Sequence, residues 1–140
     1  MIDFYKIPHY AINNIKQGAD WTTPEGYIIP NHRLVFAGDA PRSYAYCSDT
    51  AYSPSLCEPL KGVNLLYHEA TFAEDMTERA RLVGHSTARQ AAQIARAAEV
   101  GKLLLGHFSA RYEDETVLLQ EAQEVFPNAI LAHEGLCISL

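Results

Sequence analysis

Three short apolar segments of this chain each end at residues suited to metal or proton chemistry. Asp49 follows the segment 43–47, His68 and Glu69 follow 63–67, and His107 follows 102–106. Asp and His are the ligand types of hydrolytic zinc sites. In such sites the metal lowers the pKa of a bound water and stabilises charge that develops on a phosphoryl or acyl oxygen. The spacing therefore predicts a candidate hydrolytic centre.

Each of these residues has an ordinary explanation when it is considered alone. Ser48-Asp49-Thr50 fits a turn or a helix cap, His68 and Glu69 fit a polar strand exit, and Gly84-His85-Ser86-Thr87 is typical of a helix start. His107 is harder to explain by packing, because it directly follows a run of leucines. Taken together, Asp49, Glu69, His85 and His107 favour a site.

An alternation of strands and helices must position these side chains. Apolar runs of this length predict buried strands, and ligands of α/β sheets collect beyond the carboxyl ends of such strands. Capping and periodicity predict helices over 72–82, with Thr71 and Glu74 as a capping box, over 88–100 behind Thr87 and Gln90, and from Asp114 to Pro127. Further strands are expected at 27–29 and 34–37, as a pair around the turn 30–33, and at 129–132 and 136–140. The fold class is therefore α/β, within one domain spanning 1–140, whose first 24 residues are irregular apart from a short helix near 9–16.

Composition excludes several classes of protein. No run of eighteen apolar residues occurs, so no transmembrane helix is expected, and the first residues lack the features of a secretory signal. Three widely spaced cysteines fit free thiols in a reducing cytoplasm. The formal net charge of −6 argues against a self-sufficient nucleic-acid binder but is compatible with a metal that attracts an anion.

Four ordered motifs resemble ribonuclease Z, the zinc-dependent tRNA 3′-processing endonuclease of the metallo-β-lactamase fold. They are Tyr46-Cys-Ser-Asp-Thr50, His68-Glu-Ala-Thr-Phe72, Gly84-His-Ser-Thr87 and His107-Phe-Ser-Ala-Arg-Tyr112. The Asp and the final His indicate only the superfamily, whereas the second and third motifs narrow the resemblance to this group of endonucleases. The resemblance implies the C-terminal half of an αββα sandwich, and precursor tRNA as the partner.

The resemblance also implies roles for individual residues. Asp49 would bridge two zinc ions and His107 would bind one of them. His85, supported by Glu69, would act at the leaving oxygen, while His68 would be structural. Ser109 and Arg111 would lie close to the scissile phosphate.

The His-x-His-x-Asp-His motif of the family is absent from these 140 residues. We therefore expect this chain to correspond to the C-terminal half of the enzyme and, on its own, to bind zinc weakly and to leave RNA uncleaved. We also expect it to form a homo-oligomer, because faces that should meet the missing half would be exposed. Two alternatives remain open at this point: another phosphodiesterase of the same fold, and a non-catalytic association module.

Overall fold

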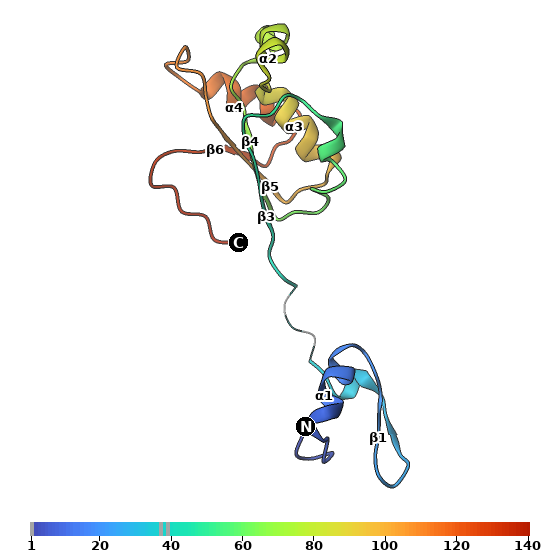
Figure 1. The fold of residues 1–140 in the computed structure, drawn as a ribbon. Coiled ribbons are helices and arrows are strands. Elements are labelled where there is room, and N and C mark those ends of the chain that lie inside the picture. The colour runs from blue at the N-terminus through green and yellow to red at the C-terminus, as the bar shows by residue number, and fades with distance from the viewer. Residues whose placement is uncertain (1, 37, 39) are drawn as a thin grey trace. The chain divides into compact units, whose positions relative to one another are not determined.

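The structure, a computed structural model, describes residues 2–36, 38 and 40–140. The chain separates into two compact units, 1–40 and 41–140. Figure 1 shows the elements of both units along the chain. None of the helices among the described residues is long and apolar enough to cross a membrane.

The first unit is built around a short helix and a two-stranded antiparallel hairpin. Its elements are α1 (His9–Lys16), β1 (Trp21–Thr22), β2 (Ile28–Ile29) and a 3₁₀ helix, η1 (Asn31–Arg33). The helix expected near 9–16 is confirmed. A small core holds the unit together, formed by Ile7, Ala11, Ile15 and Leu34.

The strand pairing predicted for this unit is wrong. Ile29 pairs with Trp21 rather than with a strand at 34–37, and Ala37 lies outside the described residues. The segment after Pro30 is held as a 3₁₀ turn, because the Asn31 side chain donates to the carbonyl oxygens of Ile15 and Ala19. These side-chain bonds are made at long range, so propensity along 27–37 does not reveal them.

The second unit contains a four-stranded, wholly parallel sheet in the order β3-β4-β5-β6. The strands predicted at 43–47, 102–106 and 129–132 are confirmed, whereas the predicted strand 63–67 is shifted so that His68 and Glu69 lie inside β4. No strand forms at 136–140. The strands and helices of this unit are β3 (Tyr44–Cys47), β4 (Leu65–Glu69), α2 (Thr77–Val83), α3 (Ala88–Ala97), β5 (Lys102–Gly106), α4 (Thr116–Gln123) and β6 (Ala129–Leu131).

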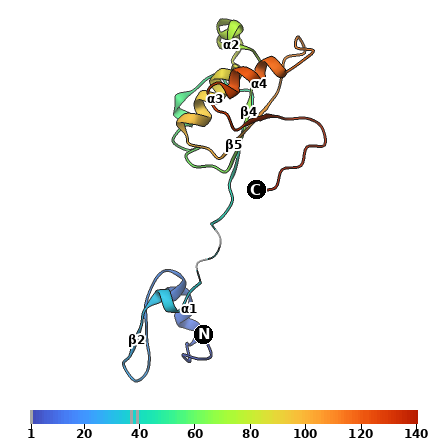
Figure 2. The same cartoon turned by 180° about the vertical axis from the view of Figure 1, so that it is seen from behind.

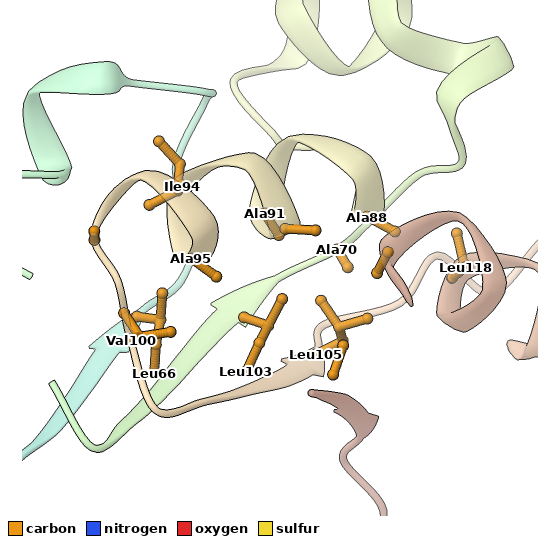
Figure 3. Packing of buried hydrophobic residues seen from close by; sticks show 14 of the residues in the cluster. Leu66, Ala70, Ala88, Ala91, Ile94, Ala95, Val100, Leu103, Leu105 and Leu118 are labelled. Atoms are coloured by element: carbon orange, nitrogen blue, oxygen red, sulfur yellow. The ribbon is translucent and has the colours of Figure 1, made fainter. Parts of the chain in front are cut away.

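The two crossover helices α3 and α4 pack against each other beside the sheet (Figure 2). Helix α3 begins with the predicted capping box, in which Thr87 and Gln90 satisfy each other's backbone N–H groups. Its alanines allow close approach to the strands, and Figure 3 shows α3 above Leu66, Leu103 and Leu105. This packing fixes the strands whose carboxyl ends carry the candidate site.

One face of the sheet is far less covered than the other. Alternate residues on the helix side, such as Leu66 and Leu103, are buried, whereas Tyr44 and Tyr46 on the opposite side are 52% and 64% exposed. The Tyr46 ring stacks on that of Tyr67, with 4.5 Å between ring centroids. We call this exposed side of the sheet, with Tyr44, Tyr46 and Tyr67, the tyrosine face.

Candidate active site

The candidate site lies where the first three strands of the parallel sheet end. Asp49 follows β3, Glu69 is the last residue of β4, and His107 comes directly after β5. His85 reaches the same place from the loop before α3. One potential ligand atom from each of these four residues lies within 4.8 Å of the others. The structure thus brings together residues that are up to 58 positions apart in the chain.

Glu69 is the buried centre of the group, and its side chain is 0% exposed. Oε1 accepts from the backbone N–H of Thr50 at 2.7 Å and lies 2.9 Å from Nδ1 of His85. Oε2 accepts from the Thr71 hydroxyl at 2.6 Å and from the backbone N–H of Ser86 at 3.1 Å. Because each oxygen already has two hydrogen-bonding partners, this carboxylate holds the surrounding loops in place and is not free to bind a metal.

The pKa of Glu69 reflects two opposing effects. Burial acts to raise it, but the hydrogen bonds from Thr71, His85 and the two backbone N–H groups outweigh burial and hold the pKa below its usual value. The carboxylate is therefore ionised at neutral pH. A negative charge next to Nδ1 of His85 favours a proton on that nitrogen and leaves Nε2 free to act on another group.

Asp49 and His107 form the part of the group that is open to a metal. Their side chains are 71% and 41% exposed, and Asp49 Oδ1 lies 3.2 Å from His107 Nε2. One carboxylate oxygen and one imidazole nitrogen fit the donor preferences of zinc. The donor set within the described residues therefore fits part of a metal centre, since catalytic zinc usually takes about three protein ligands.

Ser109 and Arg111 lie beyond His107. The Arg111 Nε donates to the Ser109 hydroxyl at 3.2 Å, and its guanidinium carbon lies 5.1 Å from the centroid of the Phe72 ring. The Phe72 ring in turn meets His85 edge-on at 6.2 Å. The aromatic ring thus links the exposed arginine to the His85 side of the site.

His68, next to Glu69, has a different environment. Its ring is completely buried, and Nδ1 lies 2.7 Å from the Glu69 carbonyl oxygen. Burial lowers the pKa of His68, which keeps the ring neutral. It points to the helix side of the sheet with Leu66, so a structural role fits it better than a role at the metal.

Thr71 is the residue whose role the sequence prediction missed. Instead of starting a helix with Glu74, it contacts Glu69 and also lies 2.9 Å from Nδ1 of His107. The helix predicted over 72–82 begins only at Thr77, after a 3₁₀ turn over Glu74–Met76. The sequence did contain a clue to this role of Thr71. Residues two positions apart in an extended segment lie on the same side, so Thr71 lies on the same side as Glu69.

Comparison with solved structures defines the class of protein. The chain is similar to the metallo-β-lactamase fold protein YhfI from Bacillus subtilis, with a TM-score of 0.62 and 28% identity over 71% of this chain and 40% of that one. A long-form ribonuclease Z from yeast gives a TM-score of 0.51 and 27% identity over 62% of this chain and 12% of that one. The chain is thus part of a metallo-β-lactamase fold, as the resemblance implied.

Sequence relatives narrow this class. The chain is 58% identical over all its 140 residues to ribonuclease Z of Bacteroides thetaiotaomicron and 60% identical to that of Bacteroides fragilis strain YCH46. It spans 44% and 46% of those relatives. No family model matches it. The chain is therefore homologous to the C-terminal part of ribonuclease Z.

Proposed function

We propose that this chain supplies the C-terminal part of an endoribonuclease that removes the 3′ trailer of precursor tRNA by phosphodiester hydrolysis. The observation that carries the proposal is the convergence of Asp49, Glu69, His85 and His107, whose ligand atoms lie within 4.8 Å of one another. The 58% identity to ribonuclease Z over the whole of this chain, which is 44% of that relative, supports precursor tRNA as the substrate. Processing of tRNA would take place in the cytoplasm.

The proposed metal is zinc, with two ions in the complete site. Asp49 and His107 would hold the metal from this chain, and the remaining ligands would come from the upstream half. When bound, the metal would supply an activated water and stabilise negative charge on the phosphate. Residues 1–140 would then act as one partial domain that the upstream half completes.

His85 is the proposed proton donor to the leaving oxygen. Its Nδ1 lies 2.9 Å from Oε1 of the buried Glu69 carboxylate, a contact that restricts the orientation of the ring. Nε2 can then deliver a proton, a contribution worth about 10²–10⁴-fold in rate. The side chain is 24% exposed, so an RNA phosphate can reach it.

Arg111 and Ser109 are proposed to bind the phosphate. A guanidinium donates several hydrogen bonds in a fixed plane, which suits phosphate oxygens. Contact with Phe72 limits where the guanidinium can lie before substrate arrives. Positive charge at this point would offset the net negative charge of the chain.

The test is a chimera that joins the upstream part of the Bacteroides thetaiotaomicron relative to this chain. We expect the purified chimera to cleave a tRNA precursor after the discriminator nucleotide and to leave a 3′-hydroxyl on the tRNA. A chimera with the Asp49→Asn substitution, purified in parallel, controls for contaminating nuclease. A folded, zinc-loaded chimera that leaves the precursor intact would contradict the proposal.

Self-association is a second proposed property, supported by the exposed tyrosine face with Tyr44 and Tyr46. Apolar area of this kind favours pairing with another copy when the upstream half does not cover it. The 140-residue chain should therefore form a homodimer or larger oligomer, and Tyr46→Glu should weaken it. Light scattering that gives a monomer mass at high micromolar concentration would exclude this.

A further inference from the structure

We propose that Thr71 is a positioning residue that fixes the ring of His107 and couples it to Glu69. The hydroxyl oxygen of Thr71 lies 2.6 Å from Glu69 Oε2, 2.9 Å from His107 Nδ1 and 3.0 Å from the His107 carbonyl oxygen. The residue is only 6% exposed, so water competes little for these contacts. The metal-binding consequence of the proposal depends on the proposed function, but the hydrogen-bond arrangement does not.

The direction of the hydrogen bonds follows from the number of protons available. Thr71 has one hydroxyl proton, and the ionised Glu69 carboxylate is its nearest and strongest acceptor. The lone pairs of the Thr71 oxygen then remain to accept a hydrogen bond, and His107 Nδ1 is the nearest donor. The neutral His107 ring therefore carries its proton on Nδ1.

This tautomer determines which nitrogen can bind a metal. With Nδ1 protonated, the lone pair of His107 is on Nε2, the atom that lies 3.2 Å from Asp49 Oδ1. A protein oxygen that holds the second nitrogen of a metal-binding His orients the ring and increases its basicity. Thr71 would do this through its contact with a buried carboxylate.

The same arrangement joins the two sides of the site. Glu69 holds His85 through Oε1 and Thr71 through Oε2, so one carboxylate orients both the proton donor and the metal ligand. The backbone adds a further restraint, because the Ser109 N–H donates to the Thr71 carbonyl oxygen at 3.1 Å. Loss of the hydroxyl would therefore disturb His107 while leaving the His85–Glu69 contact in place.

The test compares Thr71→Val, which has a similar shape and no hydroxyl, with Thr71→Ser, which keeps the hydroxyl. Thr116→Val serves as a matched control, because Thr116 also donates to a carboxylate, that of Asp114, at the start of α4. In the unsubstituted 140-residue chain without metal, long-range ¹H–¹⁵N spectra should show the neutral His107 ring protonated on Nδ1. Thr71→Val should lose this preference, and the other two variants should keep it.

In the chimera, the zinc affinity measured by chelator competition should fall about 10–100-fold for Thr71→Val. The zinc affinity should stay close to that of the unsubstituted chimera for Thr71→Ser and for Thr116→Val, because both variants keep a hydroxyl at position 71. A neutral His107 ring protonated on Nε2 in the unsubstituted chain would overturn the proposal, as would unchanged zinc affinity in Thr71→Val. The decisive spectrum is recorded on the unsubstituted chain, so it does not depend on any variant folding. The spectra also separate this proposal from the proposed function. If the chimera lacks nuclease activity but its His107 keeps the Nδ1 proton, only the proposed function is contradicted.

Discussion

His107 Nε2 lies 3.2 Å from Asp49 Oδ1, although β4 separates the two strands that precede these residues. Both residues have a left-handed backbone, with φ of 57° and 49°. A residue other than glycine loses about 1 kcal/mol or more in this region, so the surrounding structure must hold it there. We infer that both turns serve to aim their side chains at the common site.

Substitutions should separate the metal ligand from the proton donor. His107→Ala in the chimera should lower both zinc content and cleavage, because a ligand is lost. His85→Ala should lower cleavage about 10²–10⁴-fold, as expected for loss of a general acid, with zinc content unchanged. Metal analysis and single-turnover cleavage measure the two effects. Loss of zinc in His85→Ala to the same degree as in His107→Ala would refute the assignment.

Glu69→Gln should destabilise the fold and lower cleavage. An amide NH₂ would replace one carboxylate oxygen and face two hydrogen-bond donors, and each buried group left unpaired costs about 1–3 kcal/mol. Urea unfolding of the 140-residue chain measures the loss. Glu78→Gln is the control, because the exposed pair between Glu78 and Arg81 contributes at most about 1 kcal/mol. Equal effects of the two substitutions would contradict a central role for Glu69.

Stability should decline as pH falls below about 6.5, the ordinary pKa of histidine, because burial lowers the pKa of His68 in the folded state. Above that pH both the folded and the unfolded chain hold a neutral ring. Below it the unfolded chain takes up a proton that the folded chain rejects, which costs up to about 1.4 kcal/mol per pH unit.

Urea unfolding at pH 8 and pH 5.5 measures this decline. His68→Asn should reduce it, because an amide N–H can replace the Nδ1 donor without titrating. His133→Asn is the matched control, since exposed His133 makes the same contact with the carbonyl oxygen of the next residue. An undiminished decline in His68→Asn would show that another group is responsible.

Gly101→Ala should destabilise the second unit. A Cβ at Gly101 would lie 2.6 Å from the backbone oxygen of Asn64, and backbone cannot move aside as a side chain can. Overpacking of this kind costs about 1–3 kcal/mol. Gly38→Ala provides the comparison, because a Cβ there meets nothing within 4 Å. Thermal unfolding should give a clearly lower Tm for Gly101→Ala alone.

The 140-residue chain alone should bind zinc weakly and should not cleave precursor tRNA. Asp49 and His107 provide two protein ligands, whereas catalytic zinc usually takes about three. Chelator competition should give an affinity at least about tenfold below that of the chimera. Cleavage by a preparation in which Asp49→Asn removes the activity would disprove this expectation.

The sequence by itself determined the features that depend on neighbours along the chain. Apolar runs fixed three of the four parallel strands to within a residue of their bounds, and the Thr87–Gln90 capping box fixed the start of α3. The four motifs also singled out the residues that gather at the strand ends. Local periodicity and capping are short-range effects, so a single sequence reveals them.

Only the tertiary structure decided the features that depend on distant partners. Trp21 pairs with Ile29 because both side chains border the small core of the first unit. Thr71 donates its hydroxyl proton to the buried Glu69 carboxylate instead of capping the predicted helix. The alternation in burial along β3 likewise arises from helices that cover one side of the sheet. Such outcomes come from hydrogen bonds and packing between segments that folding brings together, which propensity and spacing along the chain cannot encode.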